Sequence, residues 1–161
     1  VIAKALAEKS GKASLFLDRR NLGNHSLAKA NIPIDSEGER TQIDVISLDE
    51  CIENTKIDFM KIDVQGAEGL VFAGSQNILA KWKPIILMEF WPYGLENLNT
   101  DPEDLLKMLA SFGYEFYLLD GRSQTLKVFS QESIAGIRAN RPEGKGWANM
   151  ICTTKPLFIT T

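Results

Sequence analysis

The sequence is poor in the residues that build zinc sites and disulfide frameworks. It has two cysteines and one histidine among 161 residues. Cys51 and Cys152 lie far apart within apolar segments, without a Cys-x-x-Cys pair, and His25 is distant from both. Zinc sites and disulfide scaffolds need several closely spaced ligands or more cysteine. The pattern argues against both and favours two buried thiols in a reducing, cytoplasmic compartment.

Long apolar runs and an excess of basic charge are also missing. The longest uncharged apolar run, 85–88, is far shorter than the roughly 20 residues that a membrane-spanning helix needs. The net charge is −3, and the basic residues are scattered, with Arg138, Arg141 and Lys145 as the one loose cluster. We therefore expect neither a nucleic-acid partner nor a membrane span.

What remains is the composition of a globular α/β domain. Of the residues, 44% are hydrophobic and 24% are charged, and the length is sufficient to bury one core. From residue 57 onward, strand and helix patterns alternate, which indicates parallel strands because each parallel crossover needs a helix. The expected strands are 1–7, 12–17, 41–48, 57–64, 85–90, 114–119, 125–129 and 148–153. The expected helices run from Ser47 to Glu53, from Gly66 to Trp82 with a break at Gly74, and from near Thr100 to Gly113.

The region before residue 41 has the turn chemistry of a hairpin followed by a loop. The strands 1–7 and 12–17 are separated by the turn residues 8–11, which suits an antiparallel hairpin. Residues 18–40 have no sustained period and are expected to form a long loop, which in a compact domain is usually functional or mobile. A second turn is expected at 120–123, between two of the later strands.

Three carboxylates occur where predicted strands end. Asp63 lies at the end of the strand 57–64, Glu68 follows in the first turn of the next helix, and Glu89 lies near the end of 85–90. Ligands of such sheets bind outside the carboxyl ends of the strands, so we expect these side chains at the functional rim. A charge there has a desolvation cost that needs a reason. Structural alternatives are the helix dipole for Glu68 and capping of backbone amides for Asp63 and Glu89.

Several segments of the chain occur in an order and spacing that resemble the signature of FkbM-type methyltransferases. Together they cover most of residues 1 to about 120. An ordered set of this kind is a stronger signal than any single motif. The segments are Ala5 to Gly11, Asn24 to Leu27, Ser47 to Glu50, Ile57 to Glu68, Gly74, and Lys83 to Glu89.

This resemblance implies a fold and an activity. The family has the Rossmann-like sheet of class I methyltransferases, mostly parallel with an antiparallel C-terminal strand, and transfers a methyl group from S-adenosylmethionine, usually to a hydroxyl oxygen. Carried over to this chain, the cofactor side comprises Glu8 near the adenine, with Asp63 and Gly66 at the methionine end. The acceptor side comprises Glu68 and Glu89. Further candidates for acceptor binding are Asn24, in the segment that resembles the family's asparagine-serine loop, and Trp91 and Tyr93, which follow Glu89.

The expected catalytic residues follow from the needs of methyl transfer to oxygen. The acceptor must approach in line, and a base that removes the hydroxyl proton assists. Asp63 is the first candidate for the base or for acceptor orientation, and Glu89 is the second. His25 is a third if its loop folds over the rim, although a lone loop histidine is more often solvated. Trp91 and Tyr93 are expected to form an aromatic wall, with strand-end packing as the alternative.

One position inside the motif departs from the family's pattern. Gln65 stands where the family commonly has an acid, which removes one charge from the rim. Carboxylate oxygens suit a divalent cation such as Mg²⁺. Because the sequence defines no ligand geometry for such an ion, no residue is assigned to a metal.

The glycine-rich cofactor segment of such folds has no counterpart in the sequence. The glycines before residue 66 are Gly11, Gly23 and Gly38, and none has the GxGxxG spacing. The resemblance therefore implies a partial, truncated domain over 1–161 without its N-terminal strands. Its parts would be the third strand, hairpin and loop in 1–40, the core motif region in 41–120, and the C-terminal strands in 121–161. The alternative is a non-catalytic remnant or interaction domain that keeps the fold but has lost cofactor binding.

The expected partner is a small-molecule or glycan acceptor. Sugars, lipids and natural products are all compatible with the resemblance. A sheet without its front strands would also expose an edge and an apolar face, which favours pairing of copies as a homo-oligomer.

Overall fold

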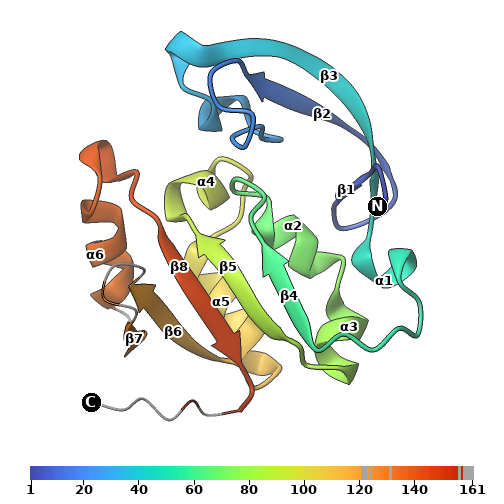
Figure 1. The fold of residues 1–161 in the computed structure, drawn as a ribbon, viewed down its shortest axis with the longest axis vertical. Helices are drawn as coiled ribbons and strands as arrows, with labels where there is room; N and C mark the ends of the chain where they lie inside the picture. The colour runs from blue at the N-terminus through green and yellow to red at the C-terminus, as the bar shows by residue number, and fades with distance from the viewer. Residues whose placement is uncertain (121–122, 124, 131, 156, 158–161) are drawn as a thin grey trace.

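The computed structural model describes residues 1–120, 123, 125–130, 132–155 and 157, whose strands form two sheets (Figure 1). The strands are β1 (Ala5–Leu6), β2 (Gly11–Asp18), β3 (Glu37–Ile46), β4 (Phe59–Ile62), β5 (Ile85–Phe90), β6 (Glu115–Asp120), β7 (Thr125–Val128) and β8 (Ala148–Thr153). The helices are α1 (Leu48–Cys51), α2 (Glu68–Ala73), α3 (Gln76–Lys81), α4 (Pro92–Glu96), α5 (Pro102–Ser111) and α6 (Glu132–Ala139), with 3-10 turns η1 (Lys29–Asn31), η2 (Ile34–Ser36) and η3 (Pro142–Gly144).

The smaller sheet has the order β1-β3-β2 and arches over one end of the larger sheet (Figure 1). β2 pairs with β3 antiparallel, whereas β1 pairs with β3 parallel, with Ala5 opposite Val45. The expected hairpin of 1–7 with 12–17 is therefore wrong, because β3 lies between these two segments. The expected loop 18–40 is also too long, since β3 already begins at Glu37. Turn residues show that a chain reverses, but they do not show which strand fills the centre of a sheet.

The larger sheet has the order β4-β5-β8-β6-β7. β4 and β5 are parallel, and the other described pairings, β5–β8, β8–β6 and β6–β7, are antiparallel. The expected antiparallel C-terminal strand is thus present as β8, but the pairing is not mostly parallel as expected. β5 and β6 run in the same direction, because both are antiparallel to β8, and the last strand separates them. The expected turn at 120–123 includes residues 121 and 122, which lie outside the described residues.

The core forms on one face of the larger sheet. Along β5, Ile86, Met88 and Phe90 are at most 1% exposed, while the residues between them face the other way. Figure 1 shows α5 behind β5 and β8, and α5 contributes the buried Leu105, Leu106 and Leu109.

The helix boundaries follow their capping residues. Asp101, rather than the expected Thr100, caps α5 by accepting from the amides of Glu103 and Asp104 at 2.8 and 3.0 Å. Ser47 caps α1 as expected, by accepting from the amide of Glu50 at 3.2 Å. α1 ends at Cys51, so it is shorter than the predicted helix to Glu53.

Two further helical features can be compared with the sequence pattern. The expected break at Gly74 is confirmed: the segment 66–82 forms α2 and α3, and a Cβ at Gly74 would lie 2.1 Å from the carbonyl oxygen of Ala7. α6 was not predicted, because Ile137 is its one buried residue among those described and Gly136 interrupts it. No described helix is long and apolar enough to cross a membrane.

Candidate functional site

The strand ends of β4 and β5 place two carboxylates side by side. Ile62 of β4 lies opposite Met88 of β5, and both point into the core. The next residue on each strand points to the other face. The parallel register therefore puts Asp63 beside Glu89, on the face away from the helices that cover the core.

The two carboxylates have different surroundings. Asp63 is partly exposed and accepts from Lys61 Nζ and Gln65 Nε2, both at 3.0 Å. Glu89 is half-buried, and no hydrogen bond or ion pair to it is found among the described residues. Burial raises the pKa of Glu89 to about 7; the negative charge of Asp63 raises it further, while Lys61 opposes the shift. Glu89 therefore can hold or release a proton near neutral pH.

A third carboxyl group, that of Glu68, lies buried beneath this pair. Glu68 is 1% exposed, and its Oε1 accepts from the amide of Val64 at 3.3 Å. Its Oε2 has no hydrogen-bond partner among the described atoms. Burial raises the pKa of Glu68 to about 7, backbone amides oppose the shift, and Glu89 adds to it. The helix-dipole alternative accounts for an exposed first-turn acid, but not for one buried with an unpartnered oxygen.

The loop after β4 is held in a left-handed conformation. Gln65 and Gly66 have φ angles of 51° and 94°. The carbonyl oxygen of Gln65 accepts from Ser26 Oγ and from Asn31 Nδ2, each at 2.8 Å. A Cβ at Gly66 would lie 2.4 Å from the carbonyl oxygen of Gly94, so this glycine allows the loop to pack against α4.

Asn31 joins three parts of the site, and sequence reasoning missed it. It is 4% exposed and reaches Gly94 O at 3.3 Å in addition to the Gln65 carbonyl. Its Oδ1 accepts from Asn97 Nδ2 at 2.7 Å. These partners are distant in sequence, and an asparagine within an irregular segment carries no signal of such contacts.

The segment after β2 is organised by a buried aspartate. Asp18 accepts from the amides of Arg20 and Asn21 and from Asn24 Nδ2, at 2.8 to 2.9 Å. The hydrogen bond from Asn24 is the main cause that lowers the pKa of Asp18 to about 2. His25 Nδ1 accepts from the amide of Asp18 at 3.0 Å, so this nitrogen helps to hold the loop.

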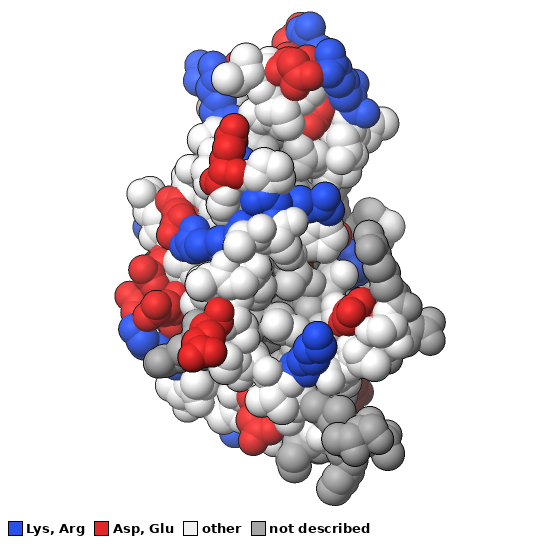
Figure 2. All heavy atoms as spheres, turned by 90° about the vertical axis from the view of Figure 1, so that its left-hand side faces the viewer, with Lys and Arg blue, Asp and Glu red and all other residues white. Residues whose placement is uncertain are grey.

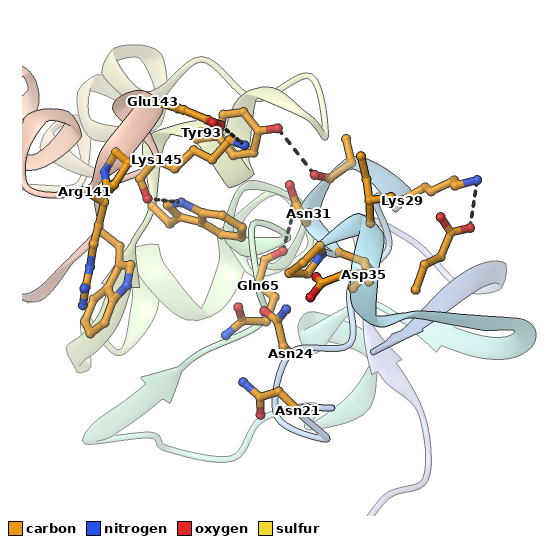
Figure 3. Close-up of a pocket in the computed structure, with 18 of the residues that line it drawn as sticks. Asn21, Asn24, Lys29, Asn31, Asp35, Gln65, Tyr93, Arg141, Glu143 and Lys145 are labelled. Carbon is orange, nitrogen blue, oxygen red and sulfur yellow. Dashed lines mark hydrogen bonds and ion pairs between the residues drawn. The ribbon is translucent and has the colours of Figure 1, made fainter. Parts of the chain in front are cut away.

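A cavity of about 1320 Å³ lies between this segment and the strand ends (Figure 3). Glu89 lines it together with Trp91 and Tyr93, whose rings lie 5.8 Å apart at 45°. Figure 3 shows Asn21, Asn24 and Gln65 on the opposite side of the view from Tyr93. Tyr93 Oη donates to Ala30 O at 3.5 Å and joins the two sides.

The remaining wall of the cavity comes from residues 141–147. Lys145 lies 5.1 Å from the centre of the Tyr93 ring, and Arg141 lies 5.9 Å from that of Trp147. Trp91 Nε1 donates to the carbonyl oxygen of Lys145 at 3.1 Å. Sequence reasoning noted Arg141 and Lys145 as a loose basic cluster but assigned them no site.

The structure brings together some of the predicted site residues and separates others. Asn24, Glu89, Trp91 and Tyr93 line the cavity, and Asp63, Gly66 and Glu68 adjoin its floor. His25 and Glu8 do not line it. Glu8 is exposed and follows Ala7, which packs against the end of α2 away from Glu68. No group of three or more His, Cys, Asp or Glu side chains in the described part of the chain could hold a metal ion.

These features define an α/β protein with a ligand-sized cavity at the carboxyl ends of its strands. The family model of the methyltransferase FkbM domain matches residues 3–116, and the chain therefore belongs to the FkbM methyltransferase family. Neither the curated proteins nor the solved structures gave a match to the chain.

Proposed function

We propose that this chain carries the acceptor side of a methyltransferase that uses S-adenosylmethionine to methylate a hydroxyl group of a sugar, a lipid or a natural product. The observation that carries the proposal is Glu89, a half-buried carboxyl at the floor of the cavity, next to Asp63 and below an aromatic wall. The family match supports the methyl-transfer chemistry.

The carboxylates of the floor fit the charged end of the cofactor. S-Adenosylmethionine is cationic at its sulfonium and amino groups, and it supplies an electrophilic methyl group when bound. Asp63 and Glu89 give the floor a negative charge that is only partly offset by Lys61. These two residues would face the cationic end. Glu8, the residue expected near the adenine, lies outside the cavity.

The residues of the cavity have separate roles in this proposal. Glu89 accepts the proton of the acceptor hydroxyl, because its pKa of about 7 suits a general base at neutral pH. Asp63 remains paired with Lys61 and keeps a fixed negative charge beside Glu89. Trp91 and Tyr93 hold the acceptor in line.

The buried Glu68 favours this proposal over a non-catalytic remnant. A carboxyl with an unpartnered oxygen at 1% exposure costs stability, and a domain that only keeps its fold has no need of it. In an active site, the two carboxyl groups are coupled, because the charge of Glu89 adds to the raised pKa of Glu68.

The test is transfer of a radiolabelled methyl group from S-adenosylmethionine to a mixture of glycans, lipids and small hydroxylated metabolites. Glu89→Gln should lower the rate at least about 100-fold, since general bases contribute factors of this size. The exposed Glu53, which does not line the cavity, provides the matched control Glu53→Gln, whose rate should be unchanged. Equal rates for wild type and Glu89→Gln would contradict the assigned base, and absence of transfer to any acceptor would contradict the methyltransferase.

A further inference from the structure

The charges that line the cavity are mostly neutralised in pairs. Lys29 pairs with Glu37 at 2.8 Å, and Lys145 pairs with Glu143 at 2.6 Å. Asp35 pairs with Arg20. Figure 2, which looks onto the side that carries α6, shows basic side chains across the middle of this face with acidic ones beside them. Most charged side chains of the wall therefore offer a ligand little net charge.

Arg141 is the exception among the described cations that line the cavity. It has no ion pair or hydrogen bond within the described part of the chain. Its guanidinium makes a cation–π contact with the Trp147 ring. A guanidinium carries a permanent charge and presents parallel donors that match the two oxygens of a carboxylate or phosphate. Arg141 therefore supplies the cavity with an unpaired cation suited to an oxoanion.

The segment that presents Arg141 is braced on both sides. Arg138 forms two hydrogen bonds with Glu96 of α4, at 3.1 and 2.5 Å. Asn140 Nδ2 donates to the carbonyl oxygen of Trp147 at 2.9 Å. A Cβ at Gly146 would lie 1.7 Å from the carbonyl oxygen of Ile137, so the chain packs closely against α6 here. Such bracing positions the guanidinium before a ligand arrives and lowers the entropic cost of binding.

The same segment lies outside the part of the chain that the family model matches. That match ends at residue 116, whereas Arg141, Lys145 and Trp147 complete the cavity wall. The shared motif supplies the carboxylates of the floor, and the later segment supplies the cation. This division suits a segment that selects the acceptor rather than one that performs the transfer.

The rest of the cavity suits a sugar ring. A pyranose has apolar C–H faces and a rim of hydroxyl groups. The tilted pair Trp91 and Tyr93 offers an aromatic surface for such a face. Asn21, Asn24 and Gln65 supply amide donors and acceptors for the rim on the opposite side (Figure 3).

We propose that the acceptor is an anionic sugar, with its ring on Trp91 and Tyr93 and its carboxylate or phosphate on Arg141. This inference rests on the proposed function only in that it treats the cavity as the acceptor site. The contact between the anion and Arg141 fixes the orientation of the sugar ring in the cavity. One hydroxyl group of the sugar then faces Glu89. A uronic acid and a sugar phosphate are the two sources of such an anion.

Tryptophan fluorescence of the full chain gives a direct test, because Trp91 and Trp147 line the cavity and Trp82 does not. The probes are methyl glucuronide, glucose phosphate and the neutral methyl glucoside. The tighter-binding anion should exceed the glucoside about tenfold in affinity, since a hydrogen-bonded charge pair contributes on the order of one such factor. The tighter of the two anions identifies the source.

Arg141→Gln should remove this preference. It should weaken binding of the anionic probe about tenfold and leave the affinity for the glucoside unchanged. Arg40→Gln is the matched control, because Arg40 is an exposed residue of β3 that does not line the cavity. Equal affinity for charged and neutral probes, or an Arg141→Gln variant that keeps the preference, would overturn the inference. If either result were found in a protein that transfers methyl groups, the proposed function would still hold. Anion-selective binding without methyl transfer would refute only the proposed function.

Discussion

At the scale of single residues, the site depends on carboxyl groups in unequal surroundings. Asp63 is partly exposed and paired, Glu89 is half-buried, and Glu68 is buried with one unpartnered oxygen. Two of them have a pKa near 7, while the pKa of Asp18 is near 2. The protonation of Glu68 and Glu89 therefore changes in a pH range separate from that of Asp18, which can be observed on its own.

The stability of the protein should fall as pH rises from about 5 to 8. The pKa of Glu68 is about 7 in the folded state and 4.5 in the unfolded state, so the folded state binds more protons in this range. Ionisation of Glu68 should cost about 3 kcal/mol of unfolding free energy by pH 8. Urea unfolding at several pH values measures the loss, and Glu68→Gln should remove the part due to Glu68 while leaving the part due to Glu89, whose pKa is also about 7.

The control for this measurement is Glu53→Gln, which replaces an exposed acid and should keep the pH dependence of the wild type. The range avoids Asp18, whose lowered pKa affects stability only as pH falls from about 4 to 2. A Glu68→Gln variant with the full pH dependence of the wild type would show that Glu68 is ionised in the folded protein.

The sequence predicted part of this constellation. Asp63 and Glu89 could be placed because a carboxylate at the end of an apolar strand is visible locally, and Trp91 and Tyr93 because they follow such an end. Asn31 and Arg141 could not be assigned, because their roles depend on contacts with segments far along the chain. His25 was expected as a base, but it accepts a hydrogen bond from its own loop and does not line the cavity.

At the scale of elements, the site depends on close contact between the loop after β4 and helix α4. Gly66 and Gly94 form this contact, and Asn31 hydrogen-bonds to the carbonyl oxygens of Gln65 and Gly94 on either side. The strands and helices around them were largely visible in the sequence. The pairing of β1 and β2 with β3 was not, because local patterns do not determine which strands are neighbours.

Gly66→Ala should destabilise the protein by about 3 kcal/mol, since a methyl group there meets backbone and the φ angle is 94°. Gly144→Ala is the matched comparison: its φ is 71°, but no atom lies within 4 Å of an added Cβ. Gly144→Ala should lower the free energy of unfolding by only about 1 kcal/mol, which is the backbone strain of the positive φ angle alone. Thermal or urea unfolding measures both, and equal losses would show that the loop does not pack against α4 as described.

At the scale of the whole molecule, two sheets create the cavity together. The β2–β3 sheet arches over the ends of β4 and β5 (Figure 1), and its connecting segment forms one side of the cavity. α4 and the segment before β8 form the other side. The α/β class and the antiparallel last strand were predictable, but a cavity between distant segments was not, because its shape depends on how the two sheets meet.

Calorimetric titration of the full-length protein with S-adenosylmethionine tests the central claim most directly. We predict saturable binding that Asp63→Asn weakens about tenfold, through loss of a fixed negative charge at the floor. Asp58→Asn is the matched control, because Asp58 is exposed, pairs with Lys56, and precedes β4 at the end away from the cavity. Absence of binding at millimolar cofactor, or equal affinity for the wild type and Asp63→Asn, would contradict the account.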